Sequence, residues 1–390
     1  MSKKSPIKFI EELAPSSQKG YEQSVKKFEE FAQTPICELI EEALAEQRAN
    51  VSEDMLKIYD RLYDFRNWMI ESGLKYNTVS THYTRITKIY RMNRVRIPYI
   101  PPMNPKRVNR SPEIEFEDIL TKDELRKIMS YFNPEERIRA MTMLSGGFAT
   151  QEAENLTKKQ FYEDLKKEGE SYHECMVRLS KSNNIIWVTK LKRQKTAKAY
   201  YGLVSPETVQ MIAEVRKNDE SSEGKLFDCN KGYFSKKCLK INEKLNLGQA
   251  GDRARLTTHS FRRFHATNIN GGVLSYEERL KVDEVDELQG RGKTSTQSAY
   301  MKTNRLHQKL LYAKVLNNIS LYNTYSYEIV DNDVVIHCIN QSKKVRKLEE
   351  ENKNLRRNLQ ENNKVSPTLK NYIKDVGFDN FVAMVKELRD

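Results

Sequence analysis

The N-terminal quarter of the chain has apolar residues at helical spacing. Between residues 17 and 93 they recur three or four positions apart in roughly four pieces, as in Tyr21, Val25 and Phe28. This spacing puts the apolar side chains on one face of each helix, where they can form a shared core. We therefore expect a small all-helical domain over residues 1–95.

The stretch that follows cannot continue a helix, because proline lacks a backbone N–H and its ring clashes with the preceding turn. Five prolines fall within 15 residues: Pro98, Pro101, Pro102, Pro105 and Pro112. The stretch also has little of the alternation that marks a strand. We interpret residues 96–115 as an extended linker between two domains.

Helical spacing resumes after this linker. It occurs in LTKDELRKIMSYF and ERIRAMTMLSGGF, and again in SPETVQMIAEVRK, THSFRRFHATNI and VDEVDELQG. Three shorter runs have strand composition: HECMVRLS around Cys175, IIWVTK, and AYYGLV. The last two flank KLKRQKTAK as the strands of a hairpin would. The sequence predicts a mainly α-helical domain over residues 116–320 with a small β-hairpin sheet.

Residues 321–390 form a C-terminal extension with a pattern of their own. From Val345 to Asn362 apolar positions repeat over about three heptads, with Asn352 at an a position. In a parallel dimer the facing g and e positions would carry opposite charges: Lys344 with Glu349, and Glu351 with Arg356. This predicts a short parallel coiled coil at about 343–363. The alternative is a charged helix packed on its own chain, since about 20 residues is a marginal length for a free helix.

Composition narrows the class of protein. The chain has 390 residues, of which 38% are hydrophobic and 31% charged, and its net charge is +13. This is typical of a charge-rich globular protein. No apolar run approaches the roughly 18 residues of a membrane span, and the first residues lack the apolar core of a secretory signal. The five cysteines are scattered, as in intracellular proteins with free thiols. We expect a cytoplasmic protein with a polyanionic partner and no membrane association.

The positive charge is concentrated around the predicted domain boundary. No acidic residue occurs between Glu71 and Glu113. The basic residues of this interval that we expect to bind DNA are Arg85, Lys88, Arg91, Arg94, Arg96, Lys106, Arg107 and Arg110. Three of them recur every third residue, so one helix face offers cations to phosphates. Two basic domains and a basic linker indicate a clamp around double-stranded DNA. Charge alone leaves open a merely solvated surface, RNA or an anionic membrane.

Two later segments hold residues suited to phosphate chemistry. His259 and Arg262, in THSFRRFHATNI, lie one helical turn apart and could grip one phosphate. In DELQGRGKTSTQSAYMK, Tyr300 follows Arg291 by nine residues. Either pattern alone is common on protein surfaces. Their order and separation in one chain are more specific.

Together these segments resemble the tyrosine recombinase family, the lambda-type integrases and Xer-like recombinases. HSFRRFHAT resembles the H-x-L-R-H box of the family, and LQGRGKTSTQSAY resembles its L-G-H segment with the nucleophilic tyrosine. Upstream, LTKDELRKIM resembles the opening of the catalytic domain, SGGFATQEAENLTKKQF its T-G-x-R-x-S-E box, and QKTAKAYYGLVSPE its lysine-bearing hairpin. The resemblance covers about residues 17–310. It implies an N-terminal helical core-binding (SAM-like) domain followed by a catalytic domain.

The resemblance implies covalent catalysis by Tyr300. Its hydroxyl would attack phosphorus to give a 3′-phosphotyrosine, and a 5′-hydroxyl from another strand would then complete the exchange. Because a phenol has a pKa near ~10, forming the phenolate at neutral pH costs about 4 kcal/mol, which nearby cations must offset. The covalent bond keeps the energy of the phosphodiester, so we expect no cofactor and no metal.

The other catalytic roles follow from the same resemblance. Arg262 and Arg291 would bind the non-bridging oxygens and stabilise the transition state. His259 would transfer a proton or bind phosphate, and Lys195 would protonate the 5′ leaving oxygen. Lys192 and Lys198 are the other candidates for this lysine.

Two positions depart from the family pattern. Arg291 stands where the family usually has His or Trp, as in archaeal viral and plasmid integrases, which the chain resembles most. Ala149 stands where the family has its first catalytic arginine. Loss of one transition-state donor costs about 10² to 10³ in rate, so we expect impaired activity. Either the natural protein lacks this arginine or an Arg→Ala change was introduced.

These observations predict a site-specific DNA recombinase that integrates a mobile element. Strand exchange would require self-association, as a dimer and as a tetramer on two DNA sites. Two alternatives remain open. One is a non-catalytic DNA-binding protein on the same fold, and the other is a type IB topoisomerase-like enzyme.

Overall fold

The computed structural model describes residues 8–104, 108–193, 199–271, 279–291, 304–331 and 333–339. Within these ranges the protein is mainly helical, with three small two-stranded sheets. This confirms the predicted fold class, mainly α with a small β-hairpin sheet. The chain divides into two units, Met1–Glu115 with Gly251–Arg253, and Phe116–Ala250 with Ala254–Asp390. The coiled coil predicted at 343–363 lies outside the described residues.

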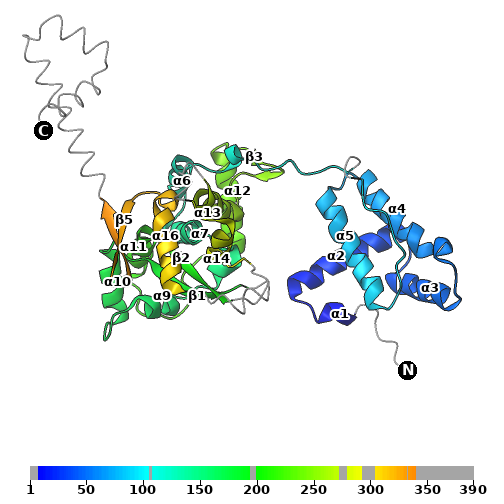
Figure 1. Ribbon diagram of the computed structural model, residues 1–390, viewed down its shortest axis with the longest axis horizontal. Helices are drawn as coiled ribbons and strands as arrows, with labels where there is room; N and C mark the ends of the chain where they lie inside the picture. The colour runs from blue at the N-terminus through cyan, green and yellow to red at the C-terminus, as the bar shows by residue number, and fades with distance from the viewer. Residues whose placement is uncertain are drawn as a thin grey trace, which may run out of the picture. The chain divides into compact units, whose positions relative to one another are not determined.

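The first unit consists of helices (Figure 1). These are α1 (Lys8–Glu11), α2 (Pro15–Ala32), α3 (Ile36–Arg48), α4 (Lys57–Glu71) and α5 (Tyr76–Met92), with a 3-10 turn at Glu53–Met55. The last four correspond to the four pieces of helical periodicity. In the core, the ring of Phe28 on α2 meets Phe65 on α4 edge-on at 4.9 Å and Tyr90 on α5 at 6.1 Å. Such edge-to-face packing of large rings is favourable and fixes how the three helices pack.

The second unit begins with helices around a β-hairpin. After a 3-10 turn at Phe116–Asp118, its elements are α6 (Lys122–Met129), α7 (Pro134–Gly146), α8 (Thr150–Glu154), α9 (Lys158–Leu165), α10 (Tyr172–Ser180), β1 (Trp187–Lys192), β2 (Ala199–Val204) and α11 (Pro206–Arg216). α6 and α7 each start with a capping box, in which the side chains at the N-cap and at N3 bond each other's backbone N–H. α7 ends at Gly146, and its C-cap Gly147 has a φ of +60°, a conformation that suits glycine.

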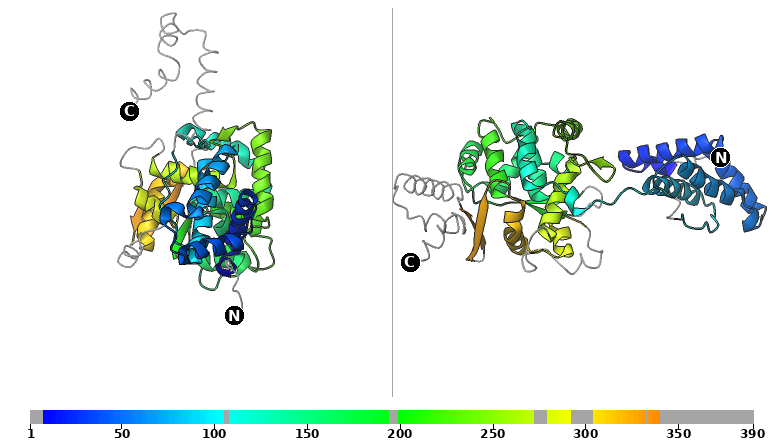
Figure 2. Two further views of the ribbon diagram at one scale, coloured as in Figure 1. Left: turned by 90° about the vertical axis from the view of Figure 1, so that its right-hand side faces the viewer. Right: turned by 90° about the horizontal axis from the view of Figure 1, so that it is seen from above.

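The rest of the second unit returns to the same core. Its elements are α12 (Lys231–Lys244), β3 (Gln249–Ala250), β4 (Arg253–Ala254), α13 (Thr258–Asn270), α14 (Val282–Leu288), α16 (Arg305–Ile319), β5 (Thr324–Val330) and β6 (Asp333–Ile339). α13 packs against α7 in the middle of this core. α16 lies beside the β5–β6 hairpin (Figures 1 and 2).

The hairpin predicted from IIWVTK and AYYGLV is present. β1 and β2 pair antiparallel from Trp187 opposite Val204 to Lys192 opposite Ala199. Gly202 on β2 is required here, because a Cβ at this position would lie 2.5 Å from the ring of Phe148. The inner face of the hairpin therefore packs closely on the residue that leads into α8.

The prediction of a strand at HECMVRLS was wrong, because this run is α10. The side chain of Ser171 accepts from the backbone N–H of Glu174, and the Glu174 carboxylate accepts from the backbone N–H of Ser171. This capping box starts a helix. Cys175, Met176 and Leu179 then fall on one buried face with helical spacing.

The β5–β6 hairpin was not predicted. It pairs from Thr324 opposite Ile339 to Val330 opposite Asp333. Tyr325 and Ile336 belong to the hydrophobic core of the second unit. The core therefore continues past residue 320, where the sequence suggested that the C-terminal extension begins.

Candidate active site

Arg262 is the buried centre of the candidate site. It lies on α13 and its side chain is 4% exposed. Its guanidinium donates to the carbonyl oxygens of Gly147 (2.6 Å) and Gln289 (2.7 Å), and it pairs with Glu152 Oε2 at 3.4 Å. Burial lowers the pKa of this guanidinium, and the Glu152 carboxylate opposes the shift. The side chain is thus held between the turn after α7 and the turn after α14.

Ala149 lies at the N-cap of α8, directly beside this centre. Its backbone N–H donates to Glu152 Oε2 at 2.7 Å, so one carboxylate oxygen both caps α8 and pairs with Arg262. The methyl side chain of Ala149 has neither charge nor hydrogen-bond donor. The site therefore gains nothing for anion binding from the side chain at this position.

A buried polar pair supports the two turns that hold Arg262. Gln289 Nε2 lies 2.9 Å from His265 Nδ1, and both side chains are buried. Burial lowers the pKa of His265 to about 3, so the imidazole is neutral at pH 7 and Nδ1 can accept this bond. A Cβ on Gly147 would lie 2.6 Å from His265 Nδ1. The pair fits only because the α7 turn ends in glycine.

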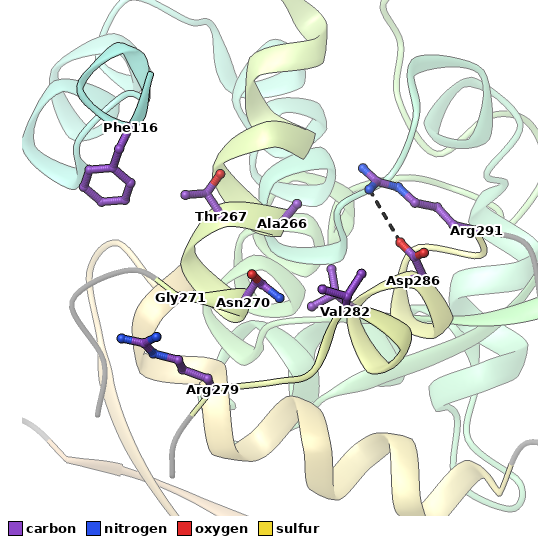
Figure 3. A pocket seen from close by; sticks show the side chains of 10 residues that line it. Phe116, Ala266, Thr267, Asn270, Gly271, Arg279, Val282, Asp286 and Arg291 are labelled. Carbon is purple, nitrogen blue, oxygen red and sulfur yellow. Dashed lines mark ion pairs between the residues drawn. The ribbon is translucent and has the colours of Figure 1, made fainter. Parts of the chain in front are cut away.

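Arg291 follows directly after this turn. Its backbone N–H donates to the carbonyl of Asp286 at 2.7 Å, and its guanidinium pairs with the Asp286 carboxylate at 3.5 Å. The side chain is 40% exposed. It lines a hollow of about 480 Å³, with Arg279 on the opposite side (Figure 3). Arg291 is thus an accessible cation at the edge of the site.

Arg193 and Tyr200 complete the site from the β1–β2 hairpin. The guanidinium of Arg193 donates to the carbonyl of Gly290 at 3.0 Å. Tyr200 packs on the same glycine, since a Cβ there would lie 2.5 Å from its ring. Burial raises the pKa of the Tyr200 phenol, and the nearby Glu152 carboxylate raises it further. Tyr200 is therefore a neutral phenol among charged groups.

The structure brings together some of the catalytic residues proposed from the sequence and not others. Arg262 and Arg291 come together around residues 289–291. His259 is exposed on α13, one turn before Arg262, and Lys192 is exposed at the end of β1. The nucleophile candidate Tyr300 and the lysines Lys195 and Lys198 lie outside the described residues.

The basic residues of the first unit also differ from one another. Arg85 is partly buried and donates to the carbonyl of Gly20 at 2.9 Å, with its guanidinium over the ring of Tyr21. The exposed members of the set are Lys88, Arg91, Arg94, Arg96 and Arg110. Lys106 and Arg107 lie outside the described residues. The exposed residues of α5 and of the segment after it are the cations available to a polyanion.

Sequence reasoning missed five side chains of the site: Glu152, Arg193, Tyr200, His265 and Gln289. Glu152 lies inside the SGGFATQEAENL segment, three residues after the N-cap of α8, but this N-cap is Ala149, which lacks the polar side chain that marks a capping box in a sequence. Arg193 has the period-2 spacing of the inward-facing positions of β1, which offered a signal. The His265–Gln289 contact joins residues 24 apart and left no local signal.

No cluster of three or more His, Cys, Asp or Glu side chains that could hold a metal occurs within the described ranges. None of the helices described combines the length and the apolar character that crossing a membrane requires.

No protein-family model and no curated protein matches this chain. Several solved structures are similar to it. The XerH site-specific recombinase bound to its difH substrate has 15% identity over 75% of this chain and 77% of that chain, with a TM-score of 0.43. A lambda integrase tetramer bound to a Holliday junction has 12% identity over 76% of each chain and a TM-score of 0.46. The Tn1549 transposon integrase with transposon right end DNA has 13% identity over 64% and 82%, with a TM-score of 0.38.

Proposed function

We propose that this protein is a site-specific DNA recombinase that cleaves and rejoins DNA through a 3′-phosphotyrosine intermediate. One observation carries the proposal. Arg262 and Arg291, which come from two segments that resemble catalytic boxes of the tyrosine recombinases, meet at the turn of residues 289–291. In the sequence, Tyr300 follows this turn.

The charges of the site favour a phosphodiester. Three guanidinium groups gather at residues 289–291. Those of Arg193 and Arg262 donate to the carbonyls of Gly290 and Gln289, and the third belongs to Arg291 itself. Among the described residues, the carboxylates that pair with them are Glu152 and Asp286. The cluster thus keeps an excess of positive charge, and guanidinium groups bind phosphate oxygens with two parallel hydrogen bonds.

The proposed reaction balances without an external energy source. The Tyr300 hydroxyl gives its proton to His259 as its oxygen attacks phosphorus, the bond from phosphorus to the 5′ oxygen breaks, and Lys195 gives that oxygen a proton. Arg262 and Arg291 stabilise the added negative charge of the transition state. A 5′-hydroxyl from another strand then gives its proton to Lys195 as it attacks the phosphotyrosine, and His259 returns a proton to the released Tyr300 oxygen.

The protein would act on double-stranded DNA as an assembly. The exposed cations of α5 and the segment after it suit the phosphate backbone of a duplex. Exchange between two duplexes requires several protomers, and the heptads at 343–363 would join them in pairs. Integration of a mobile element inside the cell is the task that the resemblance to archaeal viral and plasmid integrases suggests.

The test is an assay on supercoiled plasmid that carries the flanking sequence of the gene, scored for protein-linked DNA and for recombinant product. Tyr300→Phe should abolish both and leave DNA binding intact. Tyr99→Phe is the matched control, because Tyr99 is 79% exposed in the segment after α5. An adduct that survives Tyr300→Phe would contradict the assignment of the nucleophile.

The same assay separates the two alternatives. Relaxed plasmid without recombinant product would indicate a type IB topoisomerase-like enzyme. Binding without any adduct, with Ala149 and with arginine at that position, would indicate a non-catalytic DNA-binding protein.

A further inference from the structure

We infer that Arg193 binds the scissile phosphate in place of the arginine that position 149 lacks. This inference rests on the proposed function, because it assigns a further substrate-binding residue to the same site. The β1–β2 hairpin would thus supply the guanidinium that Ala149, at the N-terminus of α8, does not supply.

The hairpin directs Arg193 toward the site. Side chains alternate between the two faces of a strand, and along β1 Leu191 is buried while Lys190 and Lys192 are exposed. Arg193 follows on the side of Leu191, and Tyr200 is the partner of Leu191 across the hairpin. Arg193 accordingly donates to the carbonyl of Gly290, inside the site, while the two lysines point away.

Arg193 is held in place but keeps most of its donors. A guanidinium carries five N–H groups, and one contact to Gly290 occupies one nitrogen. In the part of the chain that the structure describes, Arg193 pairs with no carboxylate. Arg262, in contrast, is satisfied by two carbonyls and Glu152. Arg193 therefore offers a fixed, fork-shaped donor to an incoming anion.

The contacts of the site link Arg193 with the surroundings of Ala149. Glu152 bonds the backbone of Ala149, pairs with Arg262 and faces Tyr200. The charge of Arg193 acts on both Tyr200 and Arg262. Two guanidiniums bound to the successive carbonyls of residues 289 and 290 repel one another, and an anion between them relieves this repulsion.

The experiment is a double-mutant cycle with Arg193→Ala, Ala149→Arg and the two combined. Lys190→Ala is the matched control, because it removes an exposed cation from the same strand. The first readout is protection of the second unit by inorganic phosphate against urea, at constant ionic strength. Trp187, fully buried in the second unit, reports unfolding by fluorescence once Trp68 of the first unit is replaced by Phe. The second readout is the rate of protein–DNA adduct formation.

We expect Arg193→Ala to weaken phosphate binding roughly tenfold, as loss of a charge-assisted hydrogen bond does. The rate of adduct formation should fall about 10² to 10³-fold. Adding Ala149→Arg to this variant should restore most of both, and this rescue excludes simple misfolding. Ala149→Arg alone should change either readout less than fivefold, since the guanidinium is already supplied.

The inference is wrong if phosphate binding in Arg193→Ala equals that of Lys190→Ala, or if Ala149→Arg gives no rescue. A gain of 10²-fold from Ala149→Arg alone would also overturn it. The phosphate readout needs no activity. If it behaves as expected while the unaltered chain and every variant form no adduct, Arg193 stands as a phosphate-binding residue and the proposed recombinase function fails.

Discussion

Glu152 should contribute more to the stability of the second unit than any exposed carboxylate of that unit. Its side chain is 4% exposed and one oxygen serves both the Ala149 N–H and the Arg262 guanidinium. Glu152→Ala removes an N-terminal cap contact, worth about 1 kcal/mol. It also leaves the charge of Arg262 buried without a counter-ion, which costs about 3–5 kcal/mol in comparable pairs.

The lower end of this range applies, for a structural reason. Arg262 keeps its bonds to the carbonyls of Gly147 and Gln289, and its contact with Glu152 is long at 3.4 Å. We expect a total loss of about 3–4 kcal/mol. Because the free energy of unfolding falls by about 3 kcal/mol per M of urea, the unfolding midpoint should fall by about 1 M.

The assay is urea unfolding followed by Trp187 fluorescence in the Trp68→Phe background. Glu152→Gln should lose less, because its amide oxygen still accepts from Ala149 while the charge is gone. The control is Glu163→Ala, which removes only an exposed ion pair with Lys166 and should shift the midpoint little. If Glu152→Ala and Glu163→Ala shift the midpoint equally, Glu152 is not the counter-ion of Arg262.

Two further predictions concern other parts of the chain. Lys88→Ala or Arg91→Ala should weaken DNA binding and make the slope of log K against log salt shallower by about 0.9 for each phosphate that the variant no longer neutralises. Arg85→Ala should leave this slope unchanged, because Arg85 is bound to the carbonyl of Gly20. DNA titrations at several salt concentrations test this, and equal slopes for all three variants would contradict it. Burial raises the pKa of Glu207, so the stability that this carboxyl contributes is fully present below its ordinary pKa near 4.5 and is lost as the pH rises through its folded-state pKa. Urea unfolding measured across this pH range should therefore show the unaltered protein losing stability relative to Glu207→Gln as the pH is raised above 4.5. Midpoints of the two proteins that change in parallel with pH would refute this.

Local chemistry explains which elements could be predicted. The strands β1 and β2 are rich in β-branched and aromatic residues and flank a polar loop, so their hairpin was evident from composition. α10 was mistaken for a strand because its apolar residues were read without the Ser171–Glu174 capping box. In β5 and β6, alternating runs on either side of Asp331 and Asn332 carried a hairpin signal that the prediction did not use.

The site was predictable only in part. Arg262 and Arg291 lie in segments that resemble known boxes, and the structure brings them together. The residues that hold Arg262 in place lie far from it in the sequence. Arg193 meets Gly290 across 97 positions, and the neutral state of His265 depends on complete burial. Such contacts follow from tertiary packing, which periodicity and spacing do not encode.

The Glu207 carboxylate has a mechanical consequence for the C-terminal part of the chain. It accepts the backbone N–H groups of Leu321, Tyr322 and Asn323, directly before β5. Because β6 ends at Ile339, opposite the first residue of β5, the chain leaves the hairpin beside this anchor. A pulling force on Ile339 would therefore pass through the β5–β6 pairing to the segment before β5, which three hydrogen bonds tie to Glu207 on α11. α11 packs against α7, and the carbonyl of Gly147 directly after α7 holds Arg262, so tension applied there would load the same helices that position the site.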